Sequence, residues 1–207
     1  NFSSFYNSLK AIHHPNHKDD ILPNSKYRKR LSYDEIYANQ LEFYFNKYNK
    51  KFEKKLPKNL KMLSSKIFIE NLNFKLTSDQ LRVIHEIKKD QLSSDIMRRM
   101  IQGDVGSGKT VVAIISILNA FDCKGQSALM APTEILAKQH FITISKFLSS
   151  FKITIELLTS KVDNKSKSII HQKIKNGDVD IVIGTQSLLS KTLIFKNLKL
   201  AIIDEQH

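Results

Sequence analysis

The segment Gly103–Thr110 has the residue types and the spacing of a phosphate-binding loop, because it fits the pattern G-x-x-x-x-G-K-[ST]. In such a loop, glycines allow backbone N–H groups to surround a phosphate, and the lysine places its charge near the β- and γ-phosphates. The terminal hydroxyl binds Mg²⁺. The pattern therefore predicts a nucleotide site with Lys109 as a catalytic residue and Thr110 as a metal ligand. The predicted nucleotide contacts are Gly103, Asp104, Val105, Gly106, Ser107, Gly108, Lys109 and Thr110.

An acidic pair, Asp204-Glu205, follows the apolar run 200–203. A P-loop fold places a carboxylate that holds Mg²⁺ at the carboxyl end of a buried strand, and a neighbouring carboxylate can orient or deprotonate the attacking water. By itself such a pair is most often an ordinary loop. Because it follows a P-loop by about a hundred residues, we predict that both carboxylates are catalytic and that Asp204 holds Mg²⁺.

Three shorter stretches can be interpreted as functional once the P-loop is recognised. Thr77 and Gln80 have the spacing of a helix capping box, so Gln80 either serves only as a cap or also contacts the adenine edge of ATP. Pro132-Thr133 and Gly184-Thr185 each follow an apolar run, where free N–H groups and hydroxyls can bind a nucleic-acid phosphate. We predict these four residues as nucleic-acid contacts and Gln80 as a nucleotide contact.

The elements that position these residues follow from the hydrophobic pattern. From about residue 67 onward, short apolar runs alternate with longer amphipathic stretches, which is typical of an α/β fold with a parallel sheet flanked by helices. Strands are expected at 99–101, 128–131, 153–158, 181–183 and 200–203. Helices are expected at 78–89, 109–121, 133–149 and 165–175.

Residues 1–66 are expected to be a helical connector and residues 67–207 the nucleotide-binding domain. A short helical pattern ends at Pro15, and a longer one predicts a helix over 27–55 that stops at Pro57. Its aromatic residues either stack on nucleic acid or pack against a neighbouring domain, and packing is the more common use.

The composition is that of a globular protein, with 207 residues, 41% hydrophobic residues and a net charge of +13. The basic excess favours polyanions such as nucleic acid, although a solvated lysine-rich surface explains it equally well. No apolar run is long enough to predict a membrane span. The single cysteine, Cys123, suits a reducing cytosol and is expected to be a buried apolar side chain. We expect a cytoplasmic monomer.

Together these motifs resemble the first motor domain of superfamily-two helicases, and most closely the RecG family. Residues 102–110 are similar to the family's P-loop, and residues 204–207 are similar to its Asp-Glu-x-His (DExH) box. The other similar stretches are 129–137 with Gln139-His140, the adenine-side motif around Thr77 and Gln80, and the connector stretches 12–15 and 27–31. Two positions depart from the family pattern: Gln186 stands where His is usual, and Ser160 stands where Gly is common.

The resemblance implies a RecA-like sheet that uses ATP and Mg²⁺ to translocate on duplex DNA, remodelling stalled forks and Holliday junctions in recombination and repair. It also implies a preceding wedge domain and a following second RecA-like domain that completes the ATPase. The chain begins at Asn1 without an initiator Met, so we expect a part of a longer protein. Without the second RecA-like domain, this part is expected to be inactive alone. Two alternatives remain: a split or degraded remnant that only binds nucleotide or DNA, and another P-loop NTPase such as a metabolic kinase. The kinase alternative explains neither Gln80 nor the ending Gln206-His207.

The RecA-like fold also implies a strand order. The P-loop strand, expected at 99–101, and the DExH strand, expected at 200–203, are separated there by a strand that comes later in the chain. We therefore expect no ladder between these two segments, and a gap one strand wide. Because buried, unpaired strand edges cost free energy, residues 1–207 are not expected to fold as an independent unit.

Overall fold

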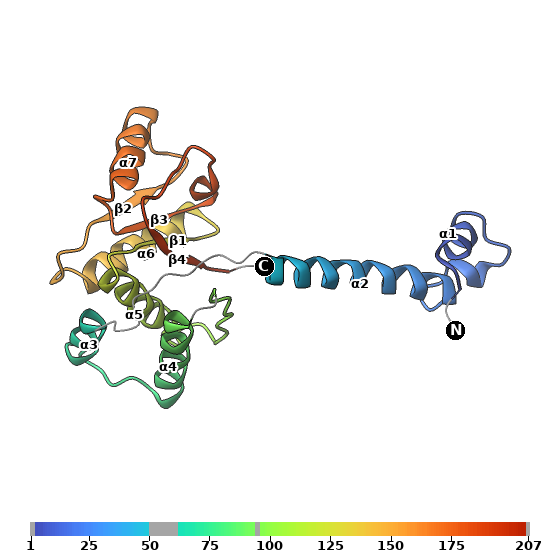
Figure 1. Ribbon diagram of the computed structural model, residues 1–207, viewed down its shortest axis with the longest axis horizontal. Helices are drawn as coiled ribbons and strands as arrows, with labels where there is room; N and C mark the ends of the chain where they lie inside the picture. The colour runs from blue at the N-terminus through green and yellow to red at the C-terminus, as the bar shows by residue number, and fades with distance from the viewer. Residues whose placement is uncertain (1–2, 50–61, 94–95, 206–207) are drawn as a thin grey trace. The chain divides into compact units, whose positions relative to one another are not determined.

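The computed structural model describes residues 3–49, 62–93 and 96–205 (Figure 1). Two compact units are distinguished, Asn1–Glu53 and Lys54–His207, and each is described by itself. The boundary expected between residues 66 and 67 falls inside helix α3 (Leu63–Glu70), which packs against α5 (Lys109–Asp122). The backbone N–H of Ser64 donates to the Asp122 carboxylate at 3.0 Å, which ties the start of α3 to the end of α5.

The first unit consists of α1 (Phe5–His13), the 3-10 turn η1 (Lys18–Ile21) and α2 (Lys26–Asn49). The Ser4 hydroxyl accepts the backbone N–H of Asn7 and so caps α1. The long helix begins close to the expected residue, whereas its expected last turns, residues 50–55, lie outside the described residues. Several large side chains of α2 are exposed, and their packing against a neighbouring domain stays a prediction. They are Tyr33, Ile36, Tyr37, Phe43, Tyr44 and Phe45.

The second unit is built on four parallel strands in the order β2-β3-β1-β4. The strands are β1 (Gln126–Met130), β2 (Ile155–Leu158), β3 (Ile181–Gly184) and β4 (Leu198–Ile203). The predicted α/β fold with a parallel sheet is confirmed. Four of the five expected strands are present near their expected positions.

The prediction of a strand at 99–101 is wrong. Within the described residues, 96–104 form neither helix nor strand, and β4 pairs with β1 alone. The expected absence of a ladder between 99–101 and β4 therefore holds, but the reason differs, because the first segment is not a strand. The Arg99 guanidinium bonds to Glu86 and Asp90 of α4 (Ser78–Leu92), and Met100 is 81% exposed. An extended segment without a ladder partner is not a strand.

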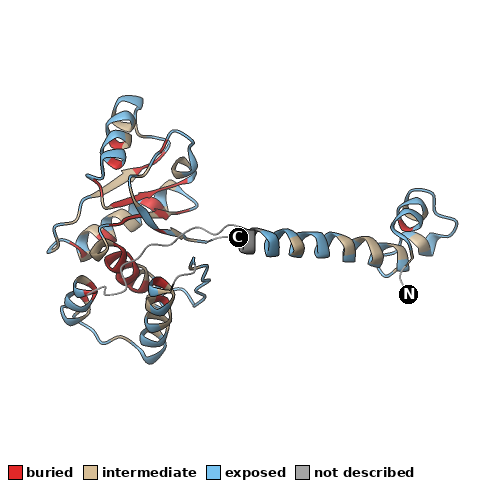
Figure 2. Cartoon of the chain, in the orientation of Figure 1, coloured by how far each residue is buried: buried red, intermediate tan, exposed pale blue. Residues whose placement is uncertain are grey.

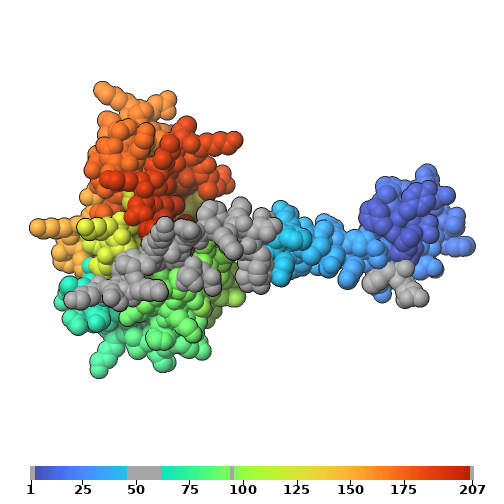
Figure 3. Space-filling model, in the orientation of Figure 1, coloured from blue at the N-terminus to red at the C-terminus, as the bar shows by residue number. Residues whose placement is uncertain are grey.

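Helices cover both faces of the sheet. Ile181 and Ile183 of β3 face a core made with α3, α5 and α6 (Glu134–Phe147), whereas Val182 faces a second core made with α7 (Asn164–Asn176). This alternation follows from the two-residue period of a strand. Figure 2 shows α5 buried along most of its length, and the space-filling view places α7 and α4 at opposite ends of this unit (Figure 3).

Because all four strands are parallel, their carboxyl ends lie at one edge of the sheet. Met130 is in register with Gly184 on one side and with Ile203 on the other, and Gly184 is in register with Leu158. The residues that follow these four positions are therefore brought to the same edge. They are Ala131, Thr185, Asp204 and Thr159.

Two further expectations can be compared with the structure. None of the helices in the described part of the chain is long and apolar enough to cross a membrane. Cys123, at the end of α5, is partly buried rather than fully buried, and its thiol lies 3.2 Å from the carbonyl oxygen of Asn119.

Candidate nucleotide and magnesium site

The P-loop makes a tight turn that leads directly into α5. Gly106 and Gly108 have φ angles of 82° and 83°, in the left-handed region that disfavours side chains. Gly108 is the N-cap of α5, whose first residue is Lys109. The free N–H groups and the dipole at the start of this long helix favour an anion.

Lys109 lies over its own loop. Its ammonium group donates to the carbonyl oxygens of Gly103 at 2.7 Å and of Asp104 at 2.8 Å. Thr110 follows in the first turn of α5 and is partly exposed. The charge predicted to meet the phosphates is therefore held at the phosphate-binding loop, as the motif requires.

Gln80 contacts two different elements. Its side-chain carbonyl accepts the N–H of Thr77 at 2.9 Å, and its backbone N–H donates to the Thr77 hydroxyl, which completes the predicted capping box. Its side-chain amide also donates to the Ser107 carbonyl at 2.9 Å. Gln80 is thus more than a cap, because it fastens α4 to the P-loop. An amide has a second N–H, but the predicted contact of Gln80 with adenine stays a prediction.

Buried amides, which the sequence analysis did not single out, hold α4 against α5. The Gln91 side chain donates to the Ser116 carbonyl at 3.0 Å and accepts from the Asn119 amide at 2.9 Å. Arg99 adds a connection from α4 to the segment before the P-loop. The hydrogen bond to Asp90 is the main reason why the pKa of Arg99 lies above its ordinary value. No local sequence pattern identifies these pairs, because their partners lie on separate segments of the chain.

Asp204 directly follows β4 and is fixed by its backbone and its side chain. Its N–H donates to the Met130 carbonyl at 2.9 Å, and its Oδ2 lies 2.8 Å from Nε2 of His140 on α6. Glu205 is exposed and has a left-handed φ of 50°. His140 is the residue near the predicted catalytic carboxylates that sequence reasoning missed. The only signal was its place beside Gln139 in a recognised motif.

The donor atoms suit Mg²⁺. Thr110 offers a hydroxyl and Asp204 a carboxylate, and Mg²⁺ is usually held by one or two carboxylates together with substrate phosphates and water. Among the described residues there is no group of three or more His, Cys, Asp or Glu that could hold a metal by itself. No hydrogen bond or ion pair in this described part joins the P-loop side chains to Asp204. The P-loop and Asp204 are connected through α5, which follows the P-loop and packs on β1 and β4.

The start of α6 is exposed and polar. Pro132 and Thr133 are exposed, and the Thr133 hydroxyl accepts the N–H of Leu136 as an N-cap. Glu134 accepts a hydrogen bond from Ser160 and pairs with Lys161 at 3.2 Å. The hydrogen bond from Ser160 is the main cause that lowers the pKa of Glu134, and Lys161 lowers it further. The α6 start is therefore tied to the loop between β2 and α7.

Gly184 and Thr185 differ from this exposed surface, because both are buried. A Cβ atom at Gly184 would lie 2.2 Å from the Leu158 carbonyl oxygen, so the glycine is required by the approach of β2. Sheet packing alone explains this residue type, and the predicted nucleic-acid contact of Gly184 and Thr185 stays a prediction.

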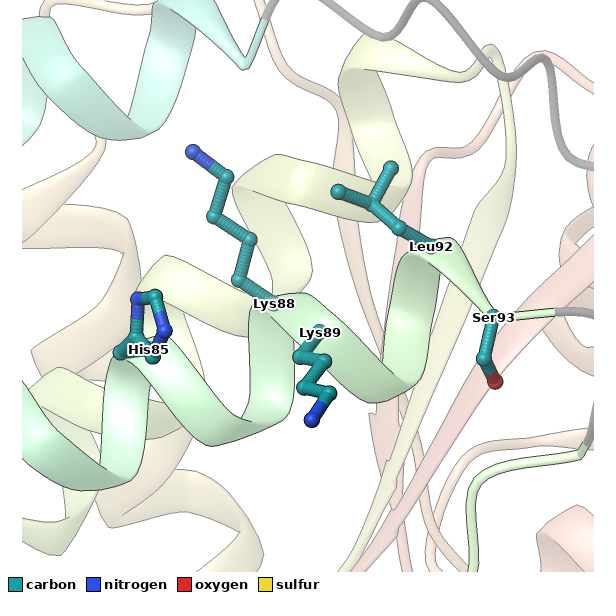
Figure 4. A pocket seen from close by; sticks show the side chains of 5 residues that line it. All are labelled: His85, Lys88, Lys89, Leu92 and Ser93. Atoms are coloured by element: carbon teal, nitrogen blue, oxygen red, sulfur yellow. The ribbon is translucent and has the colours of Figure 1, made fainter.

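A shallow recess on α4 is separate from these residues. It is lined by His85, Lys88, Lys89, Leu92 and Ser93 (Figure 4). All five belong to one helix and its C-cap, whereas ligand sites are usually concave and built by several elements. The recess therefore adds no chemistry to the P-loop site.

Comparisons with known proteins agree with this geometry. Residues 77–207 match the family model of DEAD/DEAH box helicases. The chain is similar to the ATP-dependent DNA helicase RecG of Thermotoga maritima (44% identical over 88% of this chain and 23% of that protein). It is also similar to the RecG of Aquifex aeolicus (39% identical over 100% of this chain and 26% of that protein). The chain thus spans about a quarter of the length of these curated relatives.

A solved structure of RecG bound to a three-way DNA junction has a similar fold. The TM-score is 0.73 at 41% sequence identity, and the match covers 88% of this chain and 25% of that chain. The similarity therefore extends over most of this chain and a small part of the solved one.

Proposed function

Because this chain belongs to the DEAD/DEAH box helicase family, we propose that it is the ATP-binding part of a RecG-type DNA helicase, which remodels stalled forks and Holliday junctions. The observation that carries this proposal is the similarity to RecG bound to a three-way DNA junction, at 41% identity over 88% of the chain. The proposal includes a wedge domain and a second RecA-like domain in the same protein. A monomer in the cytoplasm is part of the same proposal.

In this proposal the P-loop residues bind ATP, and each has a separate task. Lys109 neutralises charge on the β- and γ-phosphates, and the Thr110 hydroxyl and Asp204 carboxylate hold Mg²⁺, whose charge stabilises the phosphates during transfer. Glu205 orients or deprotonates the water that attacks. Gln80, already bonded to Ser107, uses its remaining amide N–H toward the adenine.

The proposed DNA surface lies at the carboxyl edge of the sheet. Pro132 and Thr133 are exposed at the start of α6, where a DNA phosphate can bind to helix N–H groups without any base contact. Gly184 is the last residue of β3 and Thr185 follows it at the same edge. Contacts of this kind hold the duplex whatever its sequence, as a translocating enzyme requires.

The test is ATP hydrolysis by the protein that contains this chain, with and without DNA. We expect Mg²⁺-dependent hydrolysis that a three-way junction stimulates more strongly than linear duplex of the same length, with unwinding of the junction. Binding of ATP and DNA without turnover would instead identify a binding module. Turnover that no DNA stimulates would favour another P-loop NTPase.

A further inference from the structure

His140 forms a hydrogen bond that joins two distant parts of the chain. Its Nε2 lies 2.8 Å from Oδ2 of Asp204, and the two side chains are 18% and 33% exposed. The residues are 64 positions apart in sequence. The bond connects the middle of α6 to the carboxylate that follows β4.

The backbone holds Asp204 to the same part of the fold. Its N–H donates to Met130, the last residue of β1, and the chain passes from Met130 through three residues into α6. Asp204 is therefore attached to the β1–α6 unit twice, once through its backbone and once through His140. Carboxylates that bind a metal are commonly oriented by such a second hydrogen bond. With Oδ2 engaged, Oδ1 keeps a defined direction.

The same helix begins at the proposed DNA surface. Thr133 is the exposed N-cap of α6, and His140 lies seven residues further, a distance of about 10 Å along the helix axis. α6 has 14 residues, and its Ala137 and Ile144 are fully buried. Because one continuous set of helical hydrogen bonds joins its start to His140, a shift at the start would reach His140. This step rests on the proposed function, which places DNA at Pro132 and Thr133.

We propose that His140 is a positioning residue that orients Asp204 toward Mg²⁺ and, through α6, couples DNA contact to the metal carboxylate. DNA bound at the start of α6 shifts the helix, and the His140 hydrogen bond carries that shift to Asp204. The bond is thus a route by which DNA stimulates ATP hydrolysis.

Two substitutions separate the hydrogen bond from the bulk of the side chain. His140→Gln keeps an N–H donor at about the reach of Nε2, whereas the amide of His140→Asn is too short to reach Asp204. Lys146→Ala is the matched control, since Lys146 is exposed in the last turn of the same helix. Each variant is made in the protein that contains this chain, and its thermal unfolding is compared with wild type.

Three quantities are measured. Electron paramagnetic resonance gives the affinity for Mn²⁺ in the presence of a non-hydrolysable ATP analogue. The other two are the affinity for a DNA junction and the rate of ATP hydrolysis with and without DNA. We expect His140→Asn to weaken Mn²⁺ binding about 10- to 100-fold and to lose most of the stimulation by DNA. Junction affinity should not change. His140→Gln and Lys146→Ala should stay near wild type in every measurement.

Wild-type Mn²⁺ affinity in the Asn variant would overturn the proposal, as would a Gln variant as defective as the Asn variant. A second measurement needs no substitution: bound Mn²⁺ must broaden the ¹⁵N signal of His140 more than those of His85 and His171, which lie on α4 and α7. Equal broadening of the three signals would also overturn the proposal. Normal Mn²⁺ binding with lost DNA coupling in the Asn variant would refute the metal-positioning role. A wild-type protein that does not respond to DNA would instead refute the proposed function, while the Mn²⁺ titration still tests His140.

Discussion

The side-chain amide of Gln80 donates to the carbonyl oxygen of Ser107 at 2.9 Å, across 27 positions of sequence. One residue therefore caps α4, by accepting from Thr77, and holds the P-loop. A Cβ atom at Gly108 would lie 2.4 Å from the same amide nitrogen, so the glycine also allows this approach. The shape of the loop thus depends on a helix that precedes it in the chain.

Substitution of Gln80 should separate its two roles. Gln80→Ala removes the acceptor of the Thr77 N–H and the bond to Ser107 but keeps the backbone bond to the Thr77 hydroxyl. We expect a loss of about 1 kcal/mol in unfolding free energy and weaker ATP binding. Thr77→Ala removes only the hydroxyl that accepts the Gln80 backbone N–H, so it should cost a similar amount of stability while ATP affinity is kept. If Gln80 also contacts adenine, only Gln80→Ala should reduce the preference for ATP over GTP. Equal effects of both variants on ATP binding and selectivity would reduce Gln80 to a cap.

Lys109→Ala should lower ATP hydrolysis at least about 10²-fold and abolish unwinding, while junction binding is kept. The reason is that the Lys109 charge lies at the P-loop, whereas the proposed DNA contacts lie at the carboxyl ends of β1 and β3. Asp204→Asn should reduce Mg²⁺-dependent turnover more than nucleotide affinity. Lys152→Ala is the control, because Lys152 is exposed near the amino end of β2. An active Lys109→Ala enzyme would contradict the P-loop assignment.

Glu134→Gln should strengthen DNA binding, because the Glu134 carboxylate pairs with Lys161 beside the proposed DNA surface. Release of Lys161 is expected to raise junction affinity about 1.5- to 5-fold and to increase the salt slope by about one. Glu156→Gln, which breaks a similar pair with Lys173, is the control and should change neither. Unchanged or weaker DNA binding by Glu134→Gln would refute the idea that Glu134 and DNA compete for Lys161.

The pH dependence of this pair follows from the lowered pKa of Glu134. A carboxyl group with a lowered pKa in the folded protein stabilises the fold above its ordinary pKa, and that contribution is lost as the pH falls through the lowered value. The pair with Lys161 should therefore stay intact throughout the neutral range. A titration of Glu134 by ¹³C NMR in Ser160→Gly should show its pKa moving up toward the ordinary value, because the Ser160 hydroxyl is the main cause of the shift.

Gly184→Ala should destabilise the sheet by about 1–3 kcal/mol, because the added Cβ would meet the Leu158 carbonyl of β2. Ser187→Ala is the matched comparison, since the Ser187 hydroxyl donates to the same carbonyl at 2.7 Å. Its loss should cost about 1 kcal/mol. Chemical unfolding of both variants measures the difference. A stable Gly184→Ala protein with weak DNA binding would show that the glycine serves DNA rather than packing.

The sequence by itself predicted the parts of this protein that depend on neighbouring residues. The P-loop spacing places Lys109 and Thr110 at the start of a helix, and the Thr77–Gln80 spacing makes a capping box. Alternating apolar runs predicted the parallel sheet. These features are set by backbone geometry and residue type over a few positions, so a pattern in one sequence is enough to find them.

Only the tertiary structure decided which distant side chains meet. His140 contacts Asp204 because β4 lies beside β1, whose chain continues into α6. The same packing makes Gly184 necessary beside Leu158. Conversely, the apolar pattern at 99–101 predicted a strand that did not form, because a strand also requires a partner for its ladder. Pairing partners and side-chain contacts depend on how elements pack, which no local pattern contains.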